Sequence, residues 1–320
     1  MFVTVRWACA GGMPALCGGS RGFCELIRRV VDRRRCIGLF ARRECGSEWL
    51  MNNTWKEQAR ARFSTAVAAP KWKRMYDVPT ESLEEENFRL RRDYTLDLIG
   101  ARYSPAARIV DVGCGTGPVV AGLWERGYRA LGLDCAPDML ALGRQRLVAL
   151  GGDPALLAEG DVTALPYEEG SVDCVVCLGV ISYVPDPQRA LREIYRVLRP
   201  GGLALVSFRN RFNPVLWDPV ALTRYLVRRL LGRGDDFPKG PGRPLDPAAV
   251  RAAVEAAGLV LEHREGLGLG PLRFRRRALL SERSAIALSR RLRSAAKRLG
   301  LGGVLPFWSD VNIYLSRKPG

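Results

Sequence analysis

The feature that most constrains the fold is a glycine-rich loop between a short apolar run and a helix. Residues 108–112 read Arg-Ile-Val-Asp-Val, which is typical of a buried strand, and Gly-Cys-Gly-Thr-Gly follows at 113–117. Pro118 then begins a stretch that we expect to be helical as far as Arg126. Glycines let the backbone turn sharply and let a ligand approach it closely. The order of strand, glycine loop and helix therefore predicts a ligand site at this loop.

The alternation of strand and helix continues along the chain. Proline marks the start of three further expected helices, at Pro137, Pro187 and Pro247. Such alternation predicts a parallel sheet with right-handed crossovers and helices on both faces. Ligands of such sheets bind beyond the carboxyl ends of the strands. The seven expected strands span residues 108–112, 130–133, 155–159, 172–178, 203–208, 259–265 and 308–315.

Acidic residues mark the ends of the first three expected strands. Asp111 lies two residues before Gly113, Asp134 ends the second strand, and Asp161 follows the third. Asp134 comes 21 residues after Gly113, a spacing at which a carboxylate can reach ribose hydroxyls. Because the carboxyl ends of parallel strands share one edge, these three carboxylates and Leu178 should lie close together.

This pattern resembles the class I S-adenosylmethionine-dependent methyltransferases, in particular their ubiquinone/menaquinone-methyltransferase-like branch with the type 11 domain. The resemblance covers roughly residues 70–270 and includes Leu-Arg-Pro-Gly-Gly at 198–202. It implies a Rossmann-like sheet of seven strands with an antiparallel last strand, helices on both faces and helical lid insertions. It also implies S-adenosylmethionine as the cofactor.

The resemblance assigns roles to individual residues. The loop would hold the methionine part of the cofactor, Asp134 the ribose hydroxyls, and Asp161 the adenine amino group. The cofactor-binding residues implied in this way are Asp111, Gly113, Cys114, Gly115, Gly117, Asp134, Asp161, Val162 and Leu178. Nicotinamide dehydrogenases use similar glycine loops, and a non-catalytic module could keep the same fold. The aspartates in register favour the methyltransferase.

Two residues are candidates for catalysis. Relatives often place a histidine just after the fourth strand, where this chain has Tyr183, so the tyrosine could orient the acceptor or cover the cofactor. His263, the single histidine of the chain, falls within the sixth expected strand. Cys174 and Cys177 have the spacing of a metal or redox pair, but within a strand their side chains point to opposite faces, and we predict no metal site.

The first hundred residues are expected to contribute less to the sheet. Residues 1–50 hold five irregularly spaced cysteines and many arginines, and we expect them to be disordered or to precede a natural start at Met51. Residues 51–107 should form a helical lid over the cofactor, with Tyr76 touching its methionine part. Residues 84–92, rich in Glu and Arg, read as a solvated helix.

The charge of the chain is concentrated in its last third. The total is +17, of which residues 209–320 contribute +13 and residues 51–208 contribute −1. Insertions at about 211–245 and 270–303 within the methyltransferase domain at 108–320 each predict a basic amphipathic helix. One apolar stripe contains Leu222, Leu226 and Leu230, and the other contains Leu288, Leu292, Ala295 and Leu299.

Two functions remain open for this basic region. It could form an interfacial surface or a lid for a hydrophobic small molecule of quinone, polyketide or lipid-linked type, in a cytoplasmic enzyme that associates peripherally with a membrane. The alternative is an RNA methyltransferase, although RNA-binding surfaces usually interleave aromatic residues with the basic ones. The chain has no apolar run long enough to span a bilayer.

Overall fold

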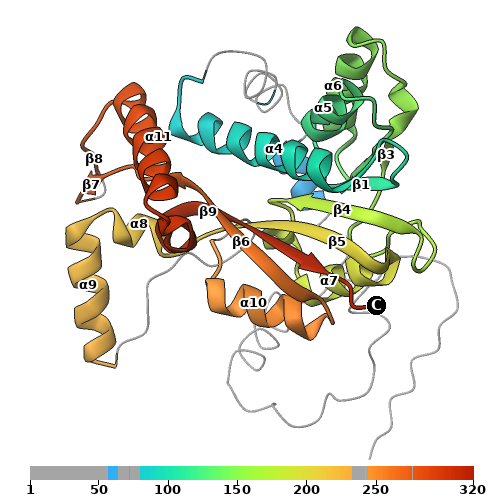
Figure 1. Ribbon diagram of the computed structural model, residues 1–320. Coiled ribbons are helices and arrows are strands. Elements are labelled where there is room, and N and C mark those ends of the chain that lie inside the picture. Colours follow the sequence, from blue (N-terminus) through green and yellow to red (C-terminus); the bar gives the residue numbers. More distant parts are fainter. Residues whose placement is uncertain (1–56, 64–71, 73–79, 233–241, 243, 276) are drawn as a thin grey trace, which may run out of the picture. The chain divides into compact units, whose positions relative to one another are not determined.

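The computed structural model describes residues 57–63, 72, 80–232, 242, 244–275 and 277–320. Residues 1–50 and Tyr76 lie outside these residues, so the predictions made for them stay predictions. The described chain forms a seven-stranded sheet with helices on both faces (Figure 1). This architecture confirms the predicted fold class.

The sheet has the strand order β3-β2-β1-β4-β5-β9-β6. Strands β1 to β5 pair in parallel, whereas β9 lies antiparallel between β5 and β6. The last strand is therefore antiparallel, as the resemblance implied. The bounds of the strands are Ile109–Val112 for β1, Leu131–Asp134 for β2, Leu157–Glu159 for β3, Val172–Leu178 for β4, Leu198–Arg209 for β5, Val260–Leu269 for β6 and Ser309–Arg317 for β9.

Several strands differ from the prediction at their ends. The sixth, for example, runs on to Leu269 instead of ending at residue 265. The third was expected from residue 155, but Pro154–Leu156 form a 3-10 turn (η1), because the Asp153 side chain accepts the N–H of Ala155 at 2.8 Å. The fifth begins earlier than expected. Gly201 and Gly202, which precede the expected strand, pair with Lys318 just after β9: the N–H of Gly201 donates to the Lys318 carbonyl at 2.9 Å, and the N–H of Lys318 donates to the Gly202 carbonyl at 3.0 Å.

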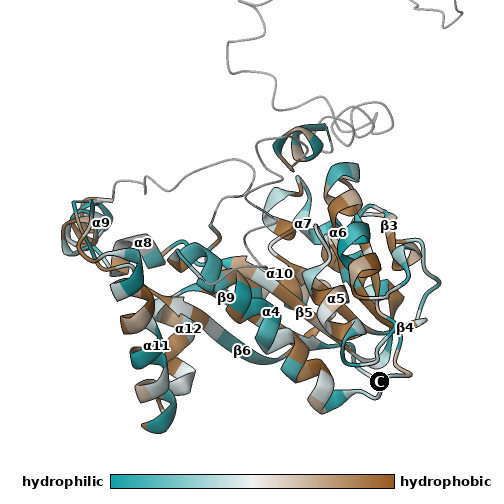
Figure 2. Cartoon of the chain, turned by 90° about the horizontal axis from the view of Figure 1, so that it is seen from above, coloured by the Kyte–Doolittle hydropathy of each residue, from teal (hydrophilic) through white to brown (hydrophobic). Residues whose placement is uncertain are grey.

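Helices cover the sheet in two layers. Helices α4 (Leu83–Arg102), α5 (Pro118–Trp124), α6 (Pro137–Ala149) and α11 (Glu282–Arg298) lie on one side, and α7 (Pro187–Val197) and α10 (Pro247–Ala256) on the other (Figure 1). Apolar colour concentrates along the strands between the two layers (Figure 2). Cys174 and Cys177 are buried in different cores on opposite faces of β4, as their spacing predicted.

Most helix starts follow simple local chemistry. Asp186, Asp218 and Asp246 each cap a helix by accepting backbone N–H groups, and a proline follows each of them. Ser82 caps α4 in a capping box with Glu85. These caps fix where each helix leaves the sheet edge.

The insertions all leave from the carboxyl edge of the sheet. After β5 come α8 (Asn213–Leu216) and α9 (Pro219–Leu230). After β6 come the hairpin of β7 (Arg273–Phe274) and β8 (Arg277–Ala278), then α11, η3 (Leu301–Val304) and α12 (Leu305–Trp308). None of the described helices is long and apolar enough to cross a membrane.

The faces of two inserted helices differ from the prediction. No side chain of α9 is buried, so this helix is not a lid packed on the core. In α11 the buried side chains are Ala285, Ile286 and Ser289, rather than the predicted leucine stripe. Leu292 and Leu299 are exposed. Helix α11 presents this face to the sheet because Arg293 and Lys297 approach Glu265 on β6.

Candidate functional site

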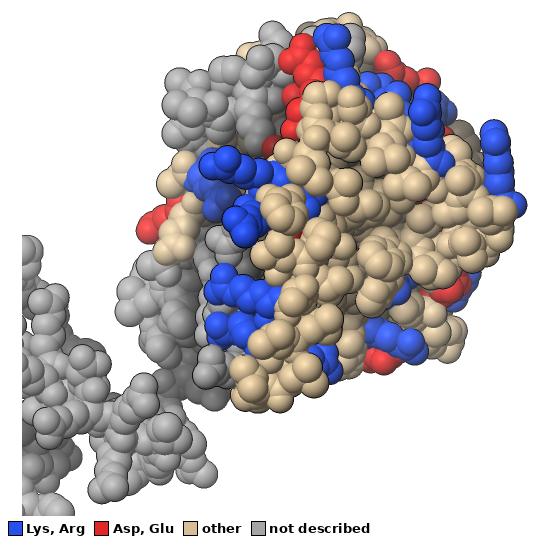
Figure 3. Space-filling view, turned by 90° about the vertical axis from the view of Figure 1, so that its left-hand side faces the viewer, with Lys and Arg blue, Asp and Glu red and all other residues tan. Residues whose placement is uncertain are grey.

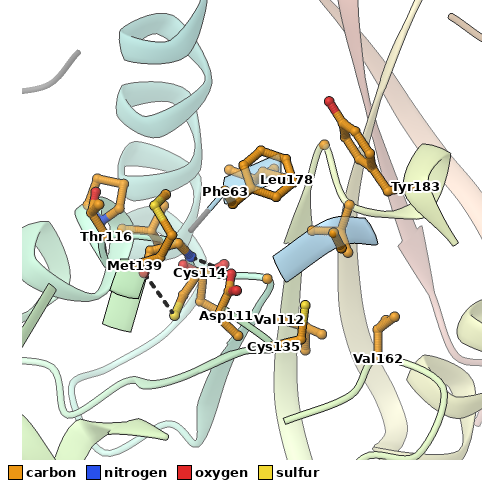
Figure 4. Close-up of a pocket in the computed structure, with 18 of the residues that line it drawn as sticks. Phe63, Asp111, Val112, Cys114, Thr116, Cys135, Met139, Val162, Leu178 and Tyr183 are labelled. Carbon is orange, nitrogen blue, oxygen red and sulfur yellow. Dashed lines mark hydrogen bonds between the residues drawn. The ribbon is translucent and has the colours of Figure 1, made fainter. Parts of the chain in front are cut away.

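A pocket opens where β1, β2 and β4 end (Figure 4). It brings together nearly all the residues that the sequence singled out. Gly117 is the exception among the loop residues, since it caps α5 in a left-handed conformation. The sequence-predicted residues that line the pocket are Asp111, Gly113, Cys114, Gly115, Asp134, Asp161, Val162, Leu178 and Tyr183.

The glycine loop presents its backbone to the pocket. Gly113, Gly115 and Gly117 all have positive φ, at 73°, 56° and 64°. The N–H groups of Gly113 and Cys114 both donate to the carbonyl of Leu133, at 2.6 and 3.0 Å. A Cβ on Gly113 would lie 2.1 Å from a methyl carbon of Val180. Both the conformation and the space therefore require glycine at 113.

Asp134 ties this loop to the end of β2. One of its carboxylate oxygens accepts the N–H of Gly115 and the other accepts the N–H of Ala136, each at 2.8 Å. Burial raises the pKa of Asp134, and the hydrogen bonds from the two amides partly offset that rise. Each oxygen keeps a second acceptor position, which suits a ligand hydroxyl.

Asp111 is a buried carboxyl group on the pocket wall. Its exposed fraction is 3%, and no side chain or backbone donor in the described chain bonds to its carboxyl oxygens. Burial, with a smaller contribution from Asp134, raises its pKa to about 8. A buried carboxyl of this kind suits a positively charged ligand group, which would favour its ionised form.

The wall around Asp161 has a different character. One oxygen of Asp161 accepts both the N–H and the hydroxyl of Thr163, each at 2.8 Å, which fixes the carboxylate at the pocket edge. Val162, the next residue along the chain, lies with Cys135 on the side of the pocket away from Thr116, and Asp111 lies between these two residues and Thr116 (Figure 4). This side of the pocket offers an apolar surface next to a carboxylate.

Four aromatic rings line another part of the pocket. Phe63 packs edge-on against Tyr183 at 5.4 Å between ring centroids and lies 5.9 Å from Trp72. Trp72 in turn lies 5.4 Å from Phe88 on α4. Of these, the sequence pointed only to Tyr183. Phe63 and Phe88 carried no sequence signal, because no pattern along the chain relates the helical residues 57–63 to α4.

Arg91 is the second feature that the sequence did not reveal. The stretch 84–92 was expected to be solvated, but Arg91 is buried at 6% exposure and lines the pocket. Its guanidinium stacks 4.0 Å from the ring centroid of Phe88. A Cβ on Gly179 would lie 2.9 Å from the guanidinium, so the glycine after β4 makes room for it. The pocket thus holds a buried positive charge.

The two catalytic candidates lie in different places. Tyr183 belongs to the short turn η2 (Ile181–Tyr183) and lines the pocket. His263 does not line it: the side chain lies on β6, half exposed, with its Nε2 3.3 Å from a carboxylate oxygen of Glu265. The structure does not bring His263 to Asp111 or Tyr183, so we do not retain it as a catalytic residue.

Comparison with known proteins identifies the family. A family model described as "Methyltransferase domain" matches residues 110–206. The ubiquinone biosynthesis O-methyltransferase of Xanthomonas axonopodis pv. citri (strain 306) is 31% identical over 192 residues, which cover 60% of this chain and 78% of that protein. The enzyme of the same name from Sodalis glossinidius (strain morsitans) is 32% identical over 190 residues, covering 58% and 72%. The chain belongs to the class I S-adenosylmethionine-dependent methyltransferases.

A solved structure agrees with this methyltransferase in fold. Magnesium protoporphyrin IX methyltransferase from Synechocystis PCC 6803 with bound SAH has a TM-score of 0.54 at 13% identity, covering 82% of this chain and 99% of that one.

The pocket of the methyltransferase fits its cofactor. Asp111 offers a carboxyl without a protein donor, and the hydroxyl of Thr116 is buried without a hydrogen-bond partner in the described chain. Thr116 thereby leaves a polar atom beside the glycine loop for the ligand.

Proposed function

We propose that this methyltransferase acts on a small hydrophobic acceptor that carries an aromatic or quinone-type ring. The observation that carries the proposal is the set of four rings, Phe63, Trp72, Phe88 and Tyr183, that line the pocket. Aromatic walls favour flat, apolar ligands through edge and face contacts. The names of the relatives, ubiquinone biosynthesis O-methyltransferases, support an acceptor of this class. They give no support to the RNA alternative.

We assign the cofactor to the carboxylates and the glycine loop. Asp134 would bind the ribose hydroxyls, and Asp161 with Val162 and Leu178 would hold the adenine. Asp111 and the backbone at 113–115 would hold the methionine part, with Asp111 facing its ammonium group. Arg91 is our addition to this set: its buried guanidinium suits the methionine carboxylate.

The bound cofactor supplies an electrophilic methyl group on a sulfonium. The protein must then hold the acceptor atom about 3–3.5 Å from that carbon and exclude water. The aromatic rings perform both tasks in this proposal. Arg92 and Arg209 also line the pocket, where each is paired with an aspartate, Asp93 and Asp310 respectively. Tyr183 covers the site with its ring rather than removing a proton.

The enzyme would be cytoplasmic and would meet its acceptor at a membrane. Quinone-type and lipid-linked acceptors partition into bilayers, because burial of each CH2 group of an apolar tail contributes about 0.8 kcal/mol. A peripheral enzyme with an apolar pocket can take such a molecule without releasing it into water.

The test combines binding with an acceptor screen. Calorimetry should detect binding of S-adenosylmethionine and of its demethylated product to the full chain. Radiolabelled methyl transfer is then screened over ring-hydroxylated quinone precursors, over polyketides and over transfer RNA. We expect transfer to ring-containing small molecules and none to RNA.

Variants of the rings make this test specific. Phe63→Ala should raise KM for the acceptor several-fold while Kd for the cofactor changes little, because Phe63 packs on Tyr183 and Trp72. Val148→Ala is the matched control, because this valine is 58% exposed on α6 and does not line the pocket. Two results would refute the proposal: methyl transfer to RNA without transfer to small molecules, or equal effects of Phe63→Ala and Val148→Ala.

A further inference from the structure

The exposed apolar side chains of this protein gather on one part of its surface. Of the large hydrophobic side chains exposed in the described chain, all but Val148, Leu150 and Val260 belong to α9, the β7–β8 hairpin, α11, η3, α12 or the residues that link them. We call the surface formed by these five elements the insertion face. Its exposed apolar residues are Val220, Leu226, Val227, Leu230, Leu231, Leu272, Phe274, Leu279, Leu292, Leu299, Leu301, Val304, Phe307 and Trp308.

Helix α9 shows that packing within the described part of the chain does not explain these residues. No side chain of the helix is buried, and Leu230 is 86% exposed. Leu226, Val227 and Leu231 are exposed on the same half of the helix. An amphipathic helix that turns its apolar half to solvent needs another apolar phase to cover it.

The elements of the insertion face form one continuous surface. The indole N–H of Trp217, at the end of α8, donates to the carbonyl of Trp308 at 2.8 Å, and the two rings lie 6.3 Å apart. The N–H of Arg273 donates to the carbonyl of Trp217 at 2.7 Å. Trp308 and Phe307 also contact each other. The hairpin, α8 with α9, and α12 are thereby held together, with aromatic rings at their junction.

The charge on this surface is almost entirely positive. Residues 270–308 contain ten basic residues and one acidic residue, and α9 contains three arginines and no acid. Three of the ten, Arg290, Arg293 and Lys297, pair with Glu86 or Glu265 outside this segment. The single acid, Glu282, accepts the backbone N–H of Leu83 at 2.8 Å. Arg277, Arg291 and Arg298 form no ion pair with the described part of the chain. Figure 3, which looks onto this end of the molecule, shows a broad tan surface bordered by blue, with red groups along its upper edge and smaller ones at its left and lower right edges.

The insertion face lies at the same edge of the sheet as the pocket. Strands β5 and β6 both run toward this edge, because each is antiparallel to β9. Arg209 ends β5, lines the pocket, and leads directly into α8 and α9. A molecule that leaves a bilayer at this face would therefore enter at the pocket edge.

We propose that the insertion face docks on an anionic lipid bilayer, with its apolar side chains in the interface and its arginines at the phosphates; the inference extends the proposed function. A basic surface that surrounds exposed leucine and aromatic side chains has the composition of a monotopic membrane contact. A protein partner would need an acidic and apolar surface whose shape matches this face. An anionic bilayer supplies both properties without a matching shape. An RNA partner would leave the exposed leucines of α9 in water.

The test is flotation of the full chain with lipid vesicles. Vesicles of phosphatidylglycerol mixed with phosphatidylcholine should carry the protein, vesicles of phosphatidylcholine alone should carry much less, and added salt should release it. Leu230→Asp should lower the partition coefficient at least tenfold. Arg291→Gln and Arg298→Gln should each lower it about fivefold, since one basic residue near an anionic membrane is worth about 1 kcal/mol.

Matched variants elsewhere keep the test specific. Val148→Asp on α6 changes a valine that is 58% exposed outside the insertion face. Arg129→Gln changes an arginine whose side chain is 70% exposed. Both should leave flotation unchanged. Brominated lipids should also quench the fluorescence of Trp308, and Trp308→Phe should reduce that quenching.

Several results would overturn this inference. The inference is wrong if Leu230→Asp floats as well as wild type, or if wild type does not float with anionic vesicles. It is also wrong if this face binds nucleic acid in a salt-dependent manner without binding vesicles, or if it forms a dimer that Leu230→Asp dissociates. Methyl transfer by the wild-type chain to a short-tailed, water-soluble acceptor is measured in parallel. Absence of that transfer would count against the proposed function and not against membrane docking.

Discussion

The carboxylate of Asp134 holds the glycine loop through a 2.8 Å hydrogen bond from the N–H of Gly115. The same carboxylate lines the pocket and accepts the N–H of Ala136, so it fixes the start of α6 as well. One side chain thus sets the shape of the loop and offers acceptor positions to the ligand. Loss of this group should affect binding through both routes.

Asp134→Ala should weaken S-adenosylmethionine binding roughly 10- to 100-fold, because each charge-assisted hydrogen bond is worth about 1.5–3 kcal/mol. Asp134→Asn keeps one acceptor oxygen and should lose less. Calorimetric Kd values for the two variants give the measurement. Asp153→Ala is the control, since Asp153 caps η1 and does not line the pocket. An unchanged Kd in Asp134→Ala would show that the ribose assignment is wrong.

Gly113→Ala should abolish cofactor binding and lower the melting temperature. The added Cβ would lie 2.1 Å from a methyl of Val180, and the φ of 73° adds strain of about 1–2 kcal/mol. Gly151→Ala separates the two causes, because Gly151 has a φ of 69° with no atom near its Cβ position. Thermal melts and calorimetry should show a larger loss at 113. Addition of Val180→Ala should recover part of the stability.

Arg91→Gln should weaken binding of both S-adenosylmethionine and its demethylated product by about tenfold or more, because both carry the carboxylate that we assign to this guanidinium. Arg89→Gln is the control on the same helix, since Arg89 bonds to Thr80 and does not line the pocket. Equal Kd values for the two variants would remove Arg91 from the site.

The strand ends could be predicted because their chemistry is local. Asp134 and Asp161 follow apolar runs at spacings that one reads along the chain, and parallel strands bring them to one edge. Arg91 could not be predicted. Its neighbours on α4 are charged, and their burial depends on contacts such as that of Glu86 with Arg290, which lies 204 residues away. The amphipathic pattern of α11 misled for the same reason, because Glu265 on β6 draws Arg293 and Lys297 inward.

The pH dependence of stability should report Asp111. Its pKa of about 8 in the folded protein lies above its ordinary value of about 3.9, so the folded state binds the extra proton between these values. The contribution of Asp111 to the free energy of unfolding therefore falls as pH rises from about 4 to about 8, by up to about 1.4 kcal/mol per pH unit. Above about pH 8 this contribution is constant. Urea midpoints from pH 5 to 9 measure this trend.

Asp111→Asn should remove that trend while leaving the fold intact. The variant should be more stable than wild type at pH 8 and similar to it near pH 4, because asparagine carries no charge in the buried site. It should also bind the cofactor more weakly, since the ammonium group loses its carboxylate partner. Parallel pH curves for the two proteins would contradict the raised pKa of Asp111.

Tyr183→Phe should retain most of the methyltransferase activity, because we assign the ring of Tyr183, and not its hydroxyl, to the site. That ring packs against Phe63 at 5.4 Å, and a Cβ on Gly242 would lie 2.5 Å from it, so the ring fills the space between two segments. Tyr183→Ala should therefore raise KM for the acceptor about tenfold, because Tyr183 is partly buried and full burial of a large side chain contributes about 1.5–3 kcal/mol. The split between KM and kcat in steady-state assays tests this role. If Tyr183→Phe instead lowered kcat by about 10²- to 10⁴-fold with KM unchanged, the hydroxyl would be acting in proton transfer.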